Sequence, residues 1–369
     1  MEKNIIYPAL CYYIAMMLSV FQILPGCNGD IQKSEYSFPG FKETAEAEFE
    51  VISDELFGLN AISDITVRGS KIIVCSVSLE DGKIMHLYDK GNVGPPMHIL
   101  NYGRGPKELL FASNISFSHV TGTMTFSDNL AAKQVNVNID VLTELGLDAV
   151  DEVQWQVPRW NVHNLKLEKG NLLTYNIGYL QRDTSKVMRL EMRDRYGNIL
   201  SAYNEFPVID NDRKRFMMYT NEIIAVSPDE EKMAIASSLG GILEIFSLKN
   251  GEIRNKATRY FIEPDFSIEG NRYNYDNLLD CFSDLYAEDD VIYAAYGGEV
   301  RMSENRNRPP EEQSLSYRNI AVFDWEGRAL KKIRTDYRIE RLCLDKGENT
   351  IYAVIKDIEG RAYIGRIRL

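Results

Sequence analysis

The stretch Asp290–Tyr296 reads Asp-Val-Ile-Tyr-Ala-Ala-Tyr, and the stretch Asn319–Gly327 reads Asn-Ile-Ala-Val-Phe-Asp-Trp-Glu-Gly. Both runs are rich in β-branched and aromatic residues, and the second ends in the acidic residue and glycine of a tight turn. The pattern returns at Thr350–Ile355, so that Tyr293 and Tyr352, each followed by Ala, stand 59 residues apart. A small antiparallel sheet that recurs along the chain is therefore the predicted building block.

Four earlier copies of this pair of strands lie toward the N-terminus: Lys71–Ser78 with Ile84–Asp89, Thr123–Asp128 with Gln134–Asp140, Asn171–Gly178 with Met188–Gly197, and Lys232–Ser238 with Leu243–Gly251. Six units of about 57 residues each are somewhat longer than common propeller blades, because a few long loops are inserted. We predict an all-β, six-bladed β-propeller of four-stranded antiparallel blades. The last unit offers three strands, and Ala47–Ser53 is expected to add the fourth and close the ring.

The composition is that of a folded, soluble chain, with 44% hydrophobic and 26% charged residues and a mean hydropathy of -0.28. It excludes an intrinsically disordered protein and a multi-span membrane protein. The formal net charge of -12 repels nucleic acid, so no nucleic-acid partner is expected. The 21 Tyr and 15 Phe favour strands. We predict one propeller domain over residues 46–369 and expect it to be monomeric.

The N-terminus resembles a bacterial lipoprotein signal. An apolar run from about Ala9 to Leu24 is too short for a spanning helix and is followed by Pro25-Gly26-Cys27. The stretch Leu24–Cys27 is similar to the lipobox, which implies a signal peptide over residues 1–26 and a lipidated Cys27. Residues 27–45 would tether the domain to the membrane. The expected location is the bacterial cell envelope, periplasmic or surface-exposed; the alternative is an ordinary buried Cys after a cleaved signal.

Three cysteines remain in the mature chain, Cys75, Cys281 and Cys343. Their odd number, their wide spacing and their apolar strand contexts favour buried structural thiols, although one disulfide bond between two of them stays open.

A turn supports a more specific resemblance. Gly103-Arg104-Gly105-Pro106-Lys107-Glu108, followed by Ile115–Phe117, resembles the turn between blades in TolB-like and NHL-like six-bladed propeller lipoproteins of bacteria. The stretches Phe282–Gly298 and Ala321–Gly327 are similar to the late blades of that family. The resemblance covers about residues 45–369 and implies the fold; it implies little about function, since propellers carry many unrelated activities.

The long loops are predicted to open on one face of the ring. In a propeller, connections between the second and third strands of a blade share a face with connections between blades. Loops of the first kind are Gly178–Lys186 and Glu299–Ser316; those of the second kind are Asn101–Leu110, Pro207–Asn221 and Glu263–Asp280. Loops this long are often functional, so this face is the predicted binding face.

These loops are cationic and aromatic in an acidic protein. The predicted ligand-binding residues are Arg104, Lys107, Tyr179, Arg213, Arg215, Tyr273, Tyr275 and Arg301. Arginine forks suit carboxylate or phosphate, and aromatic faces suit sugars or peptide side chains. The expected partner is an envelope protein, a peptide or a glycan. The alternative is that these loops are simply polar, with Tyr273–Tyr275 packed against the rim.

No sequence motif indicates catalysis. No cofactor or metal is expected, since the four His residues are not spaced as metal ligands. An enzyme stays open, because propeller lactonases and lyases assemble their sites from inner-strand polar residues without a local motif. Candidates at inner or central positions are Asp64, Asn114, Asn164 and Asp284, which are equally plausible as turn or pore-lining residues. A binding module is the first prediction, and a hydrolase or lyase that acts on a sugar derivative is the alternative.

Overall fold

A computed structural model of the chain divides into two compact units, residues 1–35 and residues 36–369. The structure describes, within the second unit, residues 37, 39–56, 62–76, 82–112, 114–128, 130–154, 162–167, 170–176, 188–194, 196–207, 218–219, 222–270, 272–298, 301, 303–304, 307–309 and 317–369. The predicted signal peptide and Cys27 therefore lie outside the described residues. No helix in the described part is long and apolar enough to cross a membrane.

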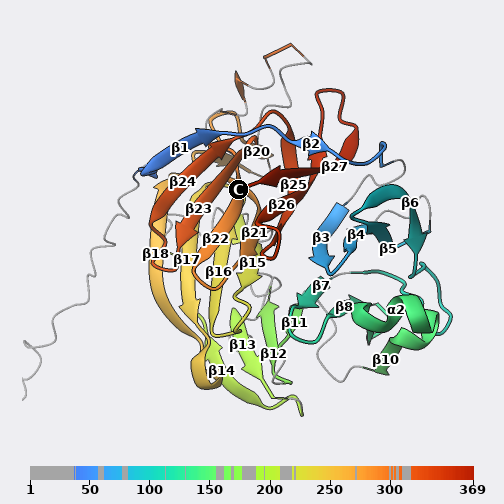
Figure 1. Ribbon diagram of the computed structural model, residues 1–369. Coiled ribbons are helices and arrows are strands. Elements are labelled where there is room, and N and C mark those ends of the chain that lie inside the picture. The colour runs from blue at the N-terminus through green and yellow to red at the C-terminus, as the bar shows by residue number, and fades with distance from the viewer. Residues whose placement is uncertain are drawn as a thin grey trace, which may run out of the picture. The chain divides into compact units, whose positions relative to one another are not determined.

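Six four-stranded antiparallel sheets make the predicted propeller, and most of their strands are labelled in Figure 1. Blade one holds β3 (Ile62–Arg68), β4 (Lys71–Ser76), β5 (Met85–Asp89) and β6 (Asn92–His98). Blade two holds β7 (Asn114–Ser118), β8 (Thr123–Asp128), β9 (Lys133–Asn138) and β10 (Val150–Gln154), and blade three holds β11 (Val162–Lys166), β12 (Leu172–Asn176), β13 (Leu190–Arg193) and β14 (Ile199–Tyr203).

The second half of the ring repeats the arrangement. Blade four holds β15 (Glu222–Val226), β16 (Lys232–Ser237), β17 (Gly241–Ser247) and β18 (Arg254–Ile262). Blade five holds β21 (Phe282–Ala287), β22 (Val291–Tyr296), β23 (Asn319–Asp324) and β24 (Ala329–Arg334). Blade six holds β25 (Arg338–Asp345), β26 (Thr350–Lys356), β27 (Ala362–Arg368) and, at its outer edge, β2 (Glu50–Val51).

The ring closes as the sequence predicts, with β2 pairing antiparallel to β27. Glu50 holds the guanidinium of Arg366 at 2.7 and 2.8 Å, and the N–H of Phe49 donates to Asp336 at 3.0 Å. One strand was not expected. β1 (Glu43–Glu46) adds to blade five in parallel with β24, so the N-terminal segment contacts two blades before the first blade begins.

Packing between blades explains why middle strands such as β4 and β26 are almost continuously apolar. Six of the seven residues of β26 are buried, and so are all but the first residue of β4. Each middle strand lies between two neighbouring sheets, so both of its faces need apolar side chains, whereas the outer strand β14 is largely exposed. Cys75, Cys281 and Cys343 are buried and unpaired, which confirms the structural thiols.

Two short helices follow β9, α2 (Ile139–Leu145) and the 3-10 helix η1 (Gly146–Ala149). A further 3-10 turn, η3 (Lys249–Gly251), joins β17 to β18, and a hairpin of β19 (Ser267–Glu269) and β20 (Arg272–Asn274) lies between blades four and five.

The antiparallel order of the four blade strands puts the connections between blades and those between second and third strands at one end of the ring. We call this the loop end; every innermost strand begins there.

Candidate ligand-binding site

A cavity of about 430 Å³ lies along the axis of the ring. It is lined by residues of all six innermost strands, from β3, β7, β11, β15, β21 and β25. We call it the axial pocket. Its volume is in the range of small-molecule sites, and its wall combines apolar side chains with a few charged ones.

Three consecutive blades carry the same irregularity in their innermost strands. In β3, Asp64 pairs with Cys75 while Ser63 is the extra residue of a bulge. In β21, Asp284 follows the bulged Ser283 in the same way. The bulge of β25 precedes Arg341. Bulges re-aim side chains, and here they bring two carboxyls and one guanidinium to equivalent places near the loop end.

Arg341 joins these three bulges. Its Nε donates to the carbonyl oxygen of Ser63 at 2.9 Å, and its Nη1 donates to the carbonyls of Ser283 at 3.2 Å and Glu340 at 2.7 Å. The inner edge of an innermost strand has no neighbouring strand, so its carbonyls need another donor. One side chain of blade six therefore fixes the inner edges of blades five, six and one.

The two carboxyls carry raised pKa values. Burial, together with the charge of Asp284, raises the pKa of Asp64 to about 7, against the opposing charge of Arg341. Burial raises the pKa of Asp284 to about 6, although Arg341 and the N–H of Leu342 favour its ionised form. Oδ2 of Asp284 accepts from Leu342 N at 2.8 Å, whereas Nε of Arg341 stays 3.9 Å from Oδ1. Ionisation of these two carboxyls in the folded protein therefore costs free energy.

A second charged group lies behind the pocket wall, between blades three and four. The guanidinium of Arg189 is completely buried, with Nη2 2.9 Å from Glu222 and Nη1 3.1 Å from Glu244. The rings of Phe206 and Tyr219 lie 4.7 and 4.9 Å from it. Burial raises the pKa of Glu222 to about 7 even with Arg189 beside it. Glu222 lines the axial pocket, so this cluster supports the wall on the side away from Asp64 and Asp284.

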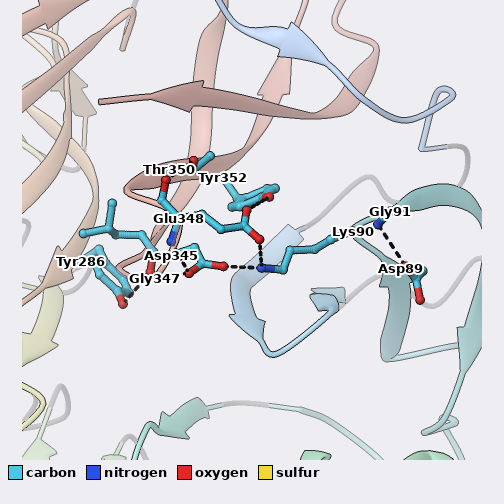
Figure 2. A network of polar contacts seen from close by, with 10 residues as sticks. Asp89, Lys90, Gly91, Tyr286, Asp345, Gly347, Glu348, Thr350 and Tyr352 are labelled. Carbon is cyan, nitrogen blue, oxygen red and sulfur yellow. Dashed lines mark hydrogen bonds and ion pairs between the residues drawn. The ribbon is translucent and has the colours of Figure 1, made fainter.

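The other end of the ring is held by ion pairs. Lys90 of blade one contacts Asp345 and, at 2.9 Å, Glu348 of blade six, and Tyr352 donates to Glu348 at 2.9 Å (Figure 2). A smaller cavity of about 280 Å³ opens beside this network, with His119 shared between it and the axial pocket. Blades six and one are therefore tied at both ends of their seam.

The loop residues predicted from the sequence are only partly assembled into one place. Tyr273 and Tyr275 stack with their rings 6.0 Å apart on the β19–β20 segment, where both are partly buried against an apolar cluster. Nη1 of Arg301 donates to the carbonyl oxygen of Asn277 at 2.8 Å. The same nitrogen lies 3.5 Å from the carboxylate of Asp265. This arrangement contains the rim packing that the alternative interpretation expected, with Arg301 added.

The remaining loop residues lie apart or outside the described part. Arg104 is exposed on the connection between blades one and two. Lys107 is engaged with blade two, since its ammonium donates to the carbonyl of Leu147 at 2.6 Å and its N–H to Glu152 at 2.8 Å. Tyr179, Arg213 and Arg215 lie outside the described residues. Of the predicted loop residues that the structure describes, none lines the axial pocket.

The four candidates predicted on innermost strands include two that line the axial pocket. Asp64 and Asp284 both line the axial pocket, while Asn114 and Asn164 occupy innermost strands β7 and β11, whose side chains at these positions are not described. The sequence reasoning missed Arg341 and Glu222. One signal was present, because Ile62-Ser63-Asp64-Ile65 and Phe282-Ser283-Asp284-Leu285 repeat a Ser-Asp pair at equivalent positions. In the described residues, no three His, Cys, Asp or Glu side chains are grouped as metal ligands.

Comparison with known proteins agrees with this architecture. The model of a family described as TolB-like 6-blade propeller-like matches residues 40–347. A candidate exported protein from Bacteroides fragilis NCTC 9343 is similar with a TM-score of 0.51 and 10% identity, covering 89% of this chain and 99% of that one. A member of the DUF4221 family from Bacteroides vulgatus has a TM-score of 0.49 and 9% identity, covering 91% and 98%. At 10% identity, the likeness to the exported protein concerns the fold alone. No curated protein matches the sequence.

Proposed function

Since this chain belongs to the TolB-like family of six-bladed propellers, we propose that it is a cell-envelope binding module that holds its ligand or partner at the loop end of the ring. One observation supports this proposal above the others. The axial pocket presents two carboxyls and a guanidinium near the end where the long loops gather, and backbone partners already hold Arg341 and Asp284 in place. Polar groups fixed before a ligand arrives reduce the entropy lost on binding.

The long connections would extend this site outward. Arg104, Arg301 and the Tyr273–Tyr275 stack belong to connections that meet the ring at the loop end. With Arg213 and Arg215 of the connection between blades three and four, they would contact an anionic glycan, a peptide or an envelope protein larger than the pocket. The pocket would then take one chemical group of such a partner, or a separate small ligand.

Attachment to the membrane through Cys27 is part of the same proposal. Leu24-Pro25-Gly26-Cys27 follows an apolar run of signal-peptide length. Radiolabelled palmitate supplied to expressing bacteria should enter the wild-type protein and not a Cys27→Ser variant. Label in both proteins, or in neither, would contradict lipidation at Cys27.

Capture from a solubilised envelope extract tests the binding function. Three immobilised baits are compared: the wild type, a variant with Arg213, Arg215 and Arg301 replaced by Ala, and a variant with Arg328→Ala, which alters an exposed turn instead. We expect a partner that the wild type and Arg328→Ala retain equally and the triple variant loses. Equal capture by all three baits would contradict a role for the cationic loops.

A second candidate function is favoured by the raised pKa values of the acidic pair. Two buried carboxyls that line one pocket and hold protons close to neutral pH are groups that a hydrolase could use as acid and base. A turnover screen with lactones and polyuronates would decide, because hydrolysis or elimination that disappears in Asp284→Asn would make the protein an enzyme. Absence of turnover over the whole screen leaves the binding module as the function.

A further inference from the structure

The acidic pair of the axial pocket has fewer hydrogen-bond donors than its oxygens can accept. Asp64 accepts from the N–H of Ile65, and Asp284 accepts from the N–H groups of Leu342 and Leu285. Among the described residues, no side chain donates a hydrogen bond to either carboxyl. An ionised carboxylate accepts about four hydrogen bonds, so each member of the pair has room for a further donor.

Arg341, which is the one cation beside the pair in the described part of the chain, is already engaged. Arg341 uses Nε and Nη1 on three carbonyl oxygens, and its closest approach to a carboxyl oxygen is 3.9 Å, too long for a hydrogen bond. Ionisation of both carboxyls therefore leaves this end of the pocket with a net negative charge. Behind the opposite wall, the positive charge of Arg189 does not reverse that sign, since it is paired with Glu222 and Glu244.

The rest of the wall suits an apolar or planar body. Phe117 and Tyr286 line the pocket together with Ile223 and Leu285. Tyr286 follows Asp284 by two residues on β21, which places the two positions about 7 Å apart along the strand. The pocket therefore combines a charged end with an aromatic and aliphatic body, at a separation that spans one ring and a short linker.

We propose that the axial pocket binds a small primary amine, whose ammonium lies between Asp64 and Asp284 and whose apolar or aromatic body packs against Phe117 and Tyr286. This proposal rests on the binding function proposed above and names the chemistry of its ligand. A protonated amine offers three donors and one positive charge, which is what the two carboxyls lack. A neutral alcohol offers one donor, and a carboxylate of the same shape adds a third negative charge.

Among the other titratable groups around the pocket, Glu222 acts in the same direction, because burial raises its pKa to about 7 and it too becomes negative between pH 6 and pH 8. Arg341 of β25 faces the pair, Tyr286 of β21 and His119 after β7 lie toward the other end, and Tyr175 of β12 and Glu222 of β15 form the opposite wall. An ammonium between the carboxyls favours their ionised forms, so binding displaces the protons that they hold at low pH. With the raised pKa values of the pair, affinity should increase about tenfold from pH 6 to pH 8, where an alkyl amine is still protonated.

The experiment is calorimetric titration of the full-length protein in detergent with three probes of one shape: phenethylamine, 2-phenylethanol and 3-phenylpropionate. At pH 8 we expect phenethylamine to bind at least ten times more tightly than either other probe. The double variant Asp64→Asn with Asp284→Asn should lose this preference. Asp290→Asn, which changes an exposed aspartate of the same blade, should keep it.

Several outcomes would overturn the proposal. Equal affinity for the amine and the alcohol, or an affinity that does not change between pH 6 and pH 8 in the wild type, would show that the pair does not recognise an ammonium. The pH series needs no variant, so it decides even if the double variant fails to fold. Binding of 3-phenylpropionate or of the alcohol alone would refute an amine ligand and would keep the pocket as a ligand site. Binding of no probe would also refute an amine ligand, and the capture experiment would then decide on the binding function.

Discussion

Arg341 on the last blade donates a hydrogen bond of 2.9 Å from its Nε to the carbonyl oxygen of Ser63 on the first blade. This bond crosses the seam at which the ring closes, and the same guanidinium also holds the carbonyl of Ser283 on blade five. The innermost strands of three blades therefore share one donor. The arrangement of the axial pocket and the closure of the propeller therefore depend on the same side chain.

Replacement of Arg341 should weaken the fold. In Arg341→Ala three carbonyl oxygens lose their donor, and the carboxyls of Asp64 and Asp284 lose the nearest positive charge. The guanidinium is partly exposed, so we expect the free energy of unfolding to fall by about 2–3 kcal/mol, below the full cost of breaking a buried pair. Denaturant unfolding would measure this loss. Arg328→Ala, on an exposed turn, should change stability by less than about 0.5 kcal/mol, and equal losses in both variants would contradict the role of Arg341.

Stability should fall as the pH rises through the range in which the acidic pair ionises. The folded pKa of Asp64 is about 7, while an aspartate in an unfolded chain titrates near about 3.9. Between these values the folded state binds more protons than the unfolded state, so the contribution of Asp64 to stability is lost with increasing pH. Asp64→Asn carries no such charge. We expect this variant to be more stable than the wild type at pH 8 by on the order of 1–2 kcal/mol, with the difference shrinking toward pH 4. Calorimetric unfolding over this range would show it, and parallel curves for the two proteins would refute it.

The three buried charges of Arg189, Glu222 and Glu244 should destabilise the protein strongly when Arg189 alone is replaced, and less when all three are replaced together. In Arg189→Met, Glu222 and Glu244 stay buried without their counterion, so stability should fall by about 3–5 kcal/mol. The triple variant Arg189→Met, Glu222→Gln, Glu244→Gln leaves no buried charge at this place. Its unfolding free energy, measured in urea, should recover at least half of the loss. A triple variant as unstable as the single one would show that the charges are not the cause.

The turn that supported the family resemblance depends on space at a glycine. Glu108 folds back so that its Oε2 accepts from the N–H of Gly105 at 2.7 Å, and a Cβ on Gly103 would lie 1.9 Å from the same oxygen. Gly103→Ala should therefore push the Glu108 carboxylate away and break its hydrogen bond to Gly105, which lowers the melting temperature by an amount equivalent to about 0.5–1.5 kcal/mol. Gly94→Ala, where a Cβ meets nothing within 4 Å, is the matched control. Glu108→Ala removes the same hydrogen bond, so adding Gly103→Ala to it should cost little more, and a full additional loss in the double variant would argue against the clash.

The sequence predicts the repeated part of this protein well. Periodic apolar strands such as Thr350–Lys356 are buried on both faces, so their pattern reports the blade directly. The closing strand near Ala47–Ser53 is predictable for a related reason, since the last unit otherwise lacks an outer strand. β1 is not predictable in this way, because its four residues are mostly exposed and carry no apolar pattern.

The pocket is harder to predict than the blades. Asp64 and Asp284 were candidates because they stand in innermost strands, but the part played by Arg341 depends on bulges that shift the register by one residue in three blades. A bulge leaves no composition signal of its own. The repeated Ser-Asp pairs mark two of the three places, and only the folded ring brings the third beside them.

A crystal structure of the protein with phenethylamine at pH 8 would test the central claim most directly. We expect the amine nitrogen within hydrogen-bond distance of the carboxyls of both Asp64 and Asp284, with the ring against Phe117 and Tyr286 and with Arg341 still bonded to the carbonyl of Ser63. An axial pocket that holds only water at a saturating amine concentration, or an amine bound with its nitrogen away from both carboxyls, would contradict it.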